Sequence, residues 1–262
     1  HPGVLAIDVS ELTGDVWIGT LGGMNRYSGG QFTTFNQFNS GLVNDVVYGV
    51  AVLDDTVWVA TTAGMSALDT VTGEWEIYTE KNAPMEEIWN YGISYGDGKV
   101  YIAVWGSGVL EFDVATEQWK DYLDPDGEME IDLYRDDGIV HVITTGTSYA
   151  DGALWVGTYF GGCRYDGRHW RGWMDHESGL TSNFINFTKG RSGTSCYNAT
   201  DYGLAVLSDF ATDRSSSSQN SKSTPNISAT RRVVSSGFGV TRMSRAPRST
   251  MSRTRSPAPT RW

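Results

Sequence analysis

One short sequence pattern recurs five times along the chain, and it restricts the fold more than any other feature. Its clearest copy is Ala153–Asp166, ALWVGTYFGGCRYD, in which an apolar-aromatic run is followed by turn residues, a Gly-Gly pair and a second short run. Branched and aromatic residues on both sides of a glycine-rich turn predict two short strands joined by a tight hairpin. The other copies lie at Val16–Tyr27, Val57–Asp69, Val100–Asp113 and Cys196–Ser208.

The spacing of the copies is nearly constant. The aromatic residue of the first predicted strand marks each copy, at Trp17, Trp58, Tyr101, Trp155 and Tyr197. The intervals between these residues are 41, 43, 54 and 42 residues. We interpret the long interval as one repeat with an insertion within Asp124–Gly152, which contains an acidic turn and a glycine-bounded loop over Thr144–Gly152.

Each period carries four strand candidates. In the fourth period they are Ile139–Thr144, Leu154–Thr158, Cys163–Tyr165 and His169–Trp173. In the fifth period they are Phe184–Thr188, Ser195–Ala199 and Leu204–Leu207, after which the pattern stops. Four short strands in about 42 residues, with no helical periodicity between them, are typical of a β-propeller blade. The sequence therefore predicts an all-β propeller of five recognisable blades over residues 1–210, the last blade being incomplete.

The repeats also resemble a known family. The pattern WIGT, then GG, a hydrophobic residue, RY and Phe over Trp17–Phe35, resembles the two-component regulator propeller repeats of extracytoplasmic bacterial sensors. The elements Ser40–Val46 and Ser178–Phe184, each with SGL before an Asn and a hydrophobic strand, extend the likeness. The resemblance implies a periplasmic or extracellular sensor module that binds a ligand or a partner protein and has no cofactor.

The composition changes abruptly near Thr212. Residues 211–262 are rich in Ser, Arg, Thr and Pro, and Thr212–Trp262 has a net charge of +9 against −20 for the preceding residues. So polar a segment does not easily bury a core. Three interpretations stay open: a disordered basic tail, a tail read in a shifted frame, and a degenerate sixth blade. A weak hairpin candidate spans Arg232–Arg242.

Charge and hydropathy exclude two partner classes. The acidic repeat region is a poor match for nucleic acid phosphates. No apolar run approaches the roughly 18 residues that a membrane helix needs, so we expect no membrane insertion. Cys163 and Cys196 replace apolar residues of other copies, which favours buried free thiols, while a bridge between neighbouring repeats and a metal or redox role are alternatives.

The catalytic motifs of common hydrolases, metalloenzymes and nucleotide-binding proteins are absent from the sequence. Ionisable residues in the predicted connections are the only catalytic candidates, namely Glu86, Glu87, Asp175, His176 and Asp201. His141 falls within a predicted strand, which favours a structural role. We therefore predict neither catalytic nor metal-binding residues, with a propeller lyase or glycosidase as an alternative.

The predicted hairpin tips carry the functional signal. In a propeller, these tips lie on the face that also carries the connections between blades, and loops on a rigid scaffold often bind ligands. The tips of copies three to five are aromatic or acidic, which no core packing demands. We expect this face to bind a small molecule such as a carbohydrate, or a protein partner, through Trp105, Tyr159, Phe160, Asp201 and Tyr202. Lateral packing between neighbouring hairpins is the alternative explanation of these aromatic tips. A second alternative is an accessory subunit of an extracellular assembly, because an incomplete ring exposes blade edges to an oligomer or hetero-assembly.

Overall fold

The computed structural model describes residues 2–123, 138–208 and 228–231, and these form five antiparallel four-stranded sheets. The first sheet contains β1 (Val4–Val9), β2 (Val16–Thr20), β3 (Gly23–Ser28) and β4 (Gln31–Phe35). The second contains β5 (Val47–Leu53), β6 (Thr56–Thr61), β7 (Gly64–Asp69) and β8 (Trp75–Tyr78). The third contains β9 (Asn90–Gly96), β10 (Lys99–Val104), β11 (Gly108–Asp113) and β12 (Gln118–Tyr122). The fourth contains β13 (Thr144–Ala150), β14 (Ala153–Thr158), β15 (Gly161–Tyr165) and β16 (Trp170–Trp173). A short helix α1 (Asp175–Ser178) leads to the fifth, with β17 (Ile185–Ser192), β18 (Ser195–Thr200), β19 (Gly203–Ser208) and β20 (Ser228–Arg231).

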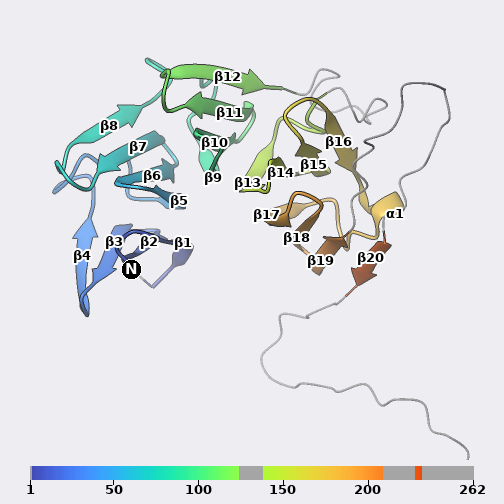
Figure 1. Ribbon diagram of the computed structural model, residues 1–262, viewed down its shortest axis with the longest axis horizontal. Helices are drawn as coiled ribbons and strands as arrows, with labels where there is room; N and C mark the ends of the chain where they lie inside the picture. The colour runs from blue at the N-terminus through green and yellow to red at the C-terminus, as the bar shows by residue number, and fades with distance from the viewer. Residues whose placement is uncertain (1, 124–137, 209–227, 232–262) are drawn as a thin grey trace, which may run out of the picture.

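The sheets are arranged as the blades of a propeller, as predicted. Within each sheet the strands pair in sequence order, and Figure 1 shows the five sheets along an arc with their first strands toward its centre. These inner strands pack in succession, β1 on β5, β5 on β9, β9 on β13 and β13 on β17. Within the described ranges, β1 and β17 do not pack on each other in this way. The first and fifth blades therefore form the two ends of the arc.

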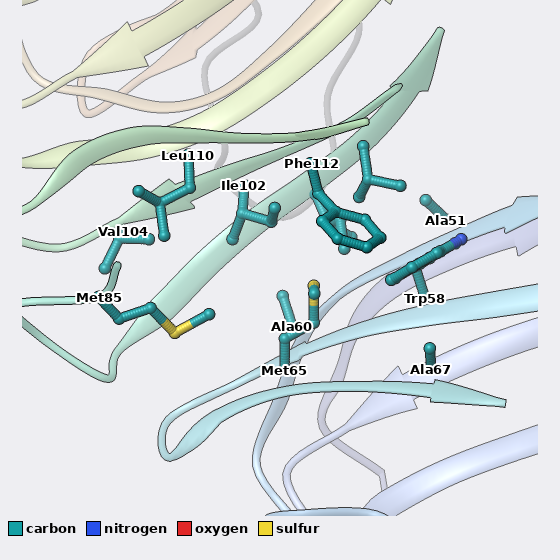
Figure 2. Packing of buried hydrophobic residues seen from close by; sticks show 12 residues of the cluster. Ala51, Trp58, Ala60, Met65, Ala67, Met85, Ile102, Val104, Leu110 and Phe112 are labelled. Carbon is teal, nitrogen blue, oxygen red and sulfur yellow. The ribbon is translucent and has the colours of Figure 1, made fainter. Parts of the chain in front are cut away.

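The core consists of four apolar seams, one between each pair of adjacent blades. Figure 2 shows the seam of blades two and three, where Trp58, Ala60 and Met65 of one blade face Ile102, Leu110 and Phe112 of the next. Sheets with both faces apolar are stable only when a neighbour covers each face, which radial packing achieves. The aromatic residue that marks each repeat packs into such a seam in the first four blades, at Trp17, Trp58, Tyr101 and Trp155.

A recurring Thr-Gly turn explains the motif in chemical terms. Thr158 at the end of β14 donates its hydroxyl proton to the Gly161 carbonyl at 2.8 Å and accepts from the Phe160 amide at 3.1 Å. The same arrangement closes the hairpins of the first, second and fifth blades through Thr20, Thr61 and Thr200. Blade three has Val104 instead, and there Thr144 of β13 donates to the Val104 and Gly108 carbonyls. The threonine side chain therefore replaces hydrogen bonds that the tight turn cannot form within its backbone.

The prediction for the inner strand of blade four is wrong. Its inner strand is Thr144–Ala150, in the segment predicted as a loop, whereas Ile139 and Val140 lie buried in the preceding connection. The strand is rich in Gly and Thr because the inner strands approach closely: a Cβ on Gly92 of β9 would lie 2.8 Å from the Gly146 Cα. Its hydroxyl groups are satisfied across the seam, as Thr147 shows by donating to the Tyr101 carbonyl at 3.1 Å.

The fifth blade is more complete than predicted. Its inner strand extends to Ser192, and Ser228–Arg231 pairs with β19 as a fourth strand. The incomplete blade is thus a correction, because the fourth strand does not follow Phe210 directly and comes from further along the chain. The predicted hairpin Arg232–Arg242 lies outside the described residues. Among the described residues, no helix is long and apolar enough to cross a membrane.

Candidate aromatic binding face

The structure brings three of the predicted site residues together. Trp105, in the hairpin tip of blade three, meets Tyr159 of the blade-four tip with ring centroids 5.8 Å apart and planes at 86°. Tyr159 and Phe160 are neighbours with centroids 5.6 Å apart. Tyr159 is 36% exposed and Phe160 41%, so both rings contribute to the surface. Aromatic contacts of this geometry are favourable beyond the area that they bury.

The contacts continue in both directions and form one run of rings across four blades. Tyr91 of β9 lies 5.1 Å from Trp105 and 4.5 Å from Tyr48 of β5, centroid to centroid. On the other side, Phe184, just before β17, lies edge-on to Tyr159 at 4.1 Å. We call the set Tyr48, Tyr91, Trp105, Tyr159 and Phe184 the aromatic run. Trp89, which is 49% exposed, flanks it beside Tyr91.

Backbone hydrogen bonds fix the tips that carry these rings. The Trp105 amide donates to the Trp89 carbonyl at 2.9 Å, and the Tyr159 amide donates to the Ile143 carbonyl at 2.9 Å. A hydrogen bond of the same kind occurs in the other three blades, from Leu21, Thr62 and Asp201. Each tip is thus tied to the residue that precedes the inner strand of its own blade. The aromatic side chains therefore project from a braced scaffold, which lowers the ordering entropy that binding costs.

The run adjoins a cavity in the centre of the arc. Its volume is about 570 Å³, and the inner strands of all five blades line it. Tyr48 and Tyr91 belong both to this lining and to the aromatic run. Burial, and then the neighbouring Tyr48, raises the pKa of Tyr91, so its hydroxyl is a neutral donor at physiological pH. The charged groups of the lining are Asp8, Glu11, Asp54 and Lys189.

The other two predicted site residues occupy the tip of blade five. Asp201 accepts a hydrogen bond from the Asn186 side-chain amide at 2.9 Å, and Tyr202 is 75% exposed. Within the described residues, no ring contact joins Tyr202 to the aromatic run. The structure therefore assembles Trp105, Tyr159 and Phe160 and leaves Asp201 and Tyr202 beside them as separate surface groups.

The sequence pattern does not single out Tyr48, Tyr91 and Phe184 as site residues. Tyr48 and Tyr91 are each the second residue of an inner strand, and aromatic residues within a strand pattern usually indicate core. Both tyrosines occupy the same position of the repeat. Because neighbouring side chains of a strand point to opposite faces, Tyr48 and Tyr91 point away from the face of the buried Val47 and Asn90. That alternation is the signal that could have identified them.

The catalytic candidates Glu86, Glu87, Asp175 and His176 are exposed, whereas His141 and the two cysteines have structural surroundings. His141 is buried, accepts from the Ile143 amide through Nδ1 at 3.0 Å and packs on Phe160. It lies before β13 and not within a strand. Cys163 and Cys196 are buried free thiols in different seams, and burial raises the pKa of Cys196 to about 12. No group of three or more His, Cys, Asp and Glu residues in the described part of the chain could hold a metal ion.

Comparisons with known proteins agree with this architecture. No family model matches the chain, and a search of curated proteins finds no match. Solved structures do match. An extracellular domain from B. thetaiotaomicron, whose name assigns it to the hybrid two component system BT4673, is 20% identical over 80% of this chain with a TM-score of 0.60. The fold is that of the β-propellers.

Two further propellers show the breadth of the likeness. The extracellular domain named for BT3049 of the same organism is 18% identical over 78% of this chain, with a TM-score of 0.59. The RRP9 WD40 repeats are 9% identical over 79% of this chain, with a TM-score of 0.61 and 60% of that protein covered. The chain spans 27% of the length of the two B. thetaiotaomicron domains. At these identities the likeness confirms the propeller that the family resemblance implied and carries no activity with it.

Proposed function

We propose that this propeller is a non-enzymatic binding module whose ligand contacts the aromatic run. The observation that supports this most directly is the unbroken series of ring contacts from Tyr48 to Phe184 beside the central cavity. Rings buried only for packing would lie in the seams, whereas Tyr159 and its neighbour Phe160 keep more than a third of their surface exposed. Partly exposed, braced aromatic rings are typical anchors for a binding partner.

The chemistry favours a small ligand with a flat apolar face and polar edges, such as a sugar ring or an aromatic compound. Because the planes of Trp105 and Tyr159 meet at 86°, such a group would stack on the face of one ring and contact the other at its edge. The Tyr91 hydroxyl and the carboxylates of the cavity would bind its polar edge. A protein partner that inserts an apolar side chain among the rings is the second candidate, and the exposed Tyr202 at the neighbouring tip favours it.

The likeness to extracellular domains of two-component systems supports a sensor role outside the cytoplasm, in the periplasm or at the cell surface. In that role the propeller would report its ligand through another domain or chain. An accessory subunit of an extracellular assembly is the alternative that the open arc favours. The lyase or glycosidase alternative has less support, because Asp201 is engaged by Asn186 and is not paired with a second carboxylate in any described contact.

A ligand panel tests the proposal. The full chain is incubated with neutral and acidic oligosaccharides and with aromatic acids, and the melting temperature and the products are followed by calorimetry and mass spectrometry. We expect at least one compound to raise the melting temperature, because a ligand that binds only the folded state stabilises it. The compound should be recovered unchanged. Release of a cleaved product would contradict a non-enzymatic module, and the absence of any stabilising compound would leave the protein-partner candidate as the favoured one.

A further inference from the structure

The aromatic residue that marks each repeat is buried in every blade except the last. Trp17, Trp58, Tyr101 and Trp155 have exposed fractions of 2%, 4%, 4% and 0%. Each faces the blade that follows it along the chain. Tyr197 holds the same register position in β18, opposite Val206 of β19, yet it is 36% exposed. The side of blade five that would face a following blade is therefore not covered by the described residues.

The other side of each blade, its receiving side, packs against the preceding blade, and there the exposed residue belongs to the first blade. One position of the third strand pairs with the residue just before the marker aromatic of the second strand. In blades one to five it is occupied by Tyr27, Leu68, Phe112, Tyr165 and Leu207. Leu68, Phe112 and Leu207 have exposed fractions of 4%, 4% and 1%, and Tyr165 is half-buried. Tyr27 is 40% exposed, and so the receiving side of blade one is uncovered.

Both uncovered sides have the chemistry of a seam. On blade one, Tyr27 packs on Phe32 with ring centroids 4.8 Å apart, next to the half-buried Val16 and Ile18. On blade five, Tyr197 and Val206 are opposite each other, as are Ala199 and Leu204. Contiguous apolar surface on a soluble protein usually marks an interaction site. The two sides are the two halves of one seam of the kind that joins every other pair of blades.

We propose that blade five of one copy of this chain docks on blade one of a second copy, forming a fifth seam head to tail. Each copy carries both halves, so the interface is heterologous and joins two different patches of the same chain. In a single molecule the two halves lie at opposite ends of the arc (Figure 1), and within the described residues β1 and β17 do not pack on each other. A second copy supplies the missing half.

Two single substitutions test this arrangement in the full chain. Tyr27→Asp places a carboxylate on the receiving side, and Tyr197→Asp places one on the donating side. Phe38→Asp is the control, because Phe38 is 96% exposed and lies in the connection after β4. Circular dichroism and thermal melting confirm that each variant folds. Mass is measured by size-exclusion chromatography with light scattering over a concentration series.

We expect the unmodified chain and Phe38→Asp to associate as concentration rises, and each face variant alone to stay at the mass of one chain. An equimolar mixture of the two face variants should give a species of two chains and nothing larger, because it retains a single intact pair of halves. A single-chain mass for the unmodified protein at every concentration would overturn the proposal. So would oligomers that persist in both variants, or a mixture that stays at the mass of one chain.

Discussion

The ring of Trp105 meets the ring of Tyr159 edge to face across the boundary between the third and fourth blades, with centroids 5.8 Å apart. Each residue sits at a hairpin tip whose amide is bonded to its own blade, at Trp89 and Ile143 respectively. The blade-three tip is also bonded to the fourth blade, because the Gly106 amide donates to the Val142 carbonyl at 3.2 Å, so backbone and ring contacts together join the two tips into one surface. A ligand that spans both rings would meet a surface already in place, which is the arrangement that keeps the ordering cost of binding low.

Gly161 is expected to tolerate a side chain less well than Gly167, although both have a positive φ. Gly161 has φ +122°, and a Cβ there would lie 2.5 Å from the Trp173 carbonyl oxygen. Gly167 has φ +87° with open space around its Cβ position. Gly167→Ala should therefore cost about 1–2 kcal/mol of unfolding free energy, as a left-handed conformation alone predicts. Gly161→Ala should cost clearly more in urea denaturation, and equal losses for the two variants would contradict the turn geometry.

The hydroxyl of Thr144 should contribute more to the free energy of unfolding than the hydroxyl of a surface threonine. It is fully buried and donates to the Val104 carbonyl at 3.0 Å and to the Gly108 carbonyl at 2.6 Å. Thr144→Val keeps the shape and removes the donor, so we expect a loss of about 1–3 kcal/mol. Thr33→Val on the exposed strand β4 is the matched control and should stay within about 0.5 kcal/mol of the unmodified protein. Denaturant midpoints for both variants decide the question.

Stability should fall in acid partly through Asp15. The hydrogen bond from Ser28 lowers the pKa of this carboxyl below 3.8, against the opposing effect of burial, and Arg26 and Thr13 add to the lowering. A lowered pKa contributes stability above the unfolded-state pKa, and the contribution is lost as the pH falls through the folded-state value.

Asp15→Asn should therefore be less stable than the unmodified chain at neutral pH and should lose less stability between about pH 5 and pH 2. Urea titrations at several pH values measure both curves. Ser28→Ala should show part of the same effect. Parallel curves for Asp15→Asn and the unmodified protein would show that this carboxyl does not contribute to the acid transition.

The sequence predicts the strands of this fold well where branched and aromatic residues form short runs beside glycine-rich turns. Trp17 and Trp58 lie in such runs, and their strands lie where the pattern places them. The inner strand Thr144–Ala150 was missed because its small and hydroxyl residues read as a loop. Its strand character comes from the close approach of Gly92 and Gly146 and from hydrogen bonds across the seam, which no local pattern contains.

The candidate site likewise contains residues that the sequence predicts and residues that it does not. Trp105 and Tyr159 could be predicted as candidates because a turn tip lies outside the core of its own blade, whereas their contact with each other is seen only in the structure. Tyr48 and Tyr91 could not be separated from core residues, since only the tertiary arrangement shows that their rings contact each other near the central cavity. The open seam at Tyr27 and Tyr197 likewise cannot be predicted from the sequence, because it depends on the exposed fractions of these side chains in the folded chain.

Calorimetric titration of Trp105→Ala shows whether the aromatic run binds the ligand. The titrant is the panel compound that most raises the melting temperature of the unmodified chain, and Phe38→Ala is the control because Phe38 lies outside the run. Loss of a stacking aromatic anchor typically costs about 2 kcal/mol or more, which corresponds to a loss of affinity of roughly 30-fold. We predict that loss for Trp105→Ala and unchanged affinity for Phe38→Ala, with both variants folded by circular dichroism. Unchanged affinity in Trp105→Ala would contradict the account and place the binding site elsewhere on the propeller.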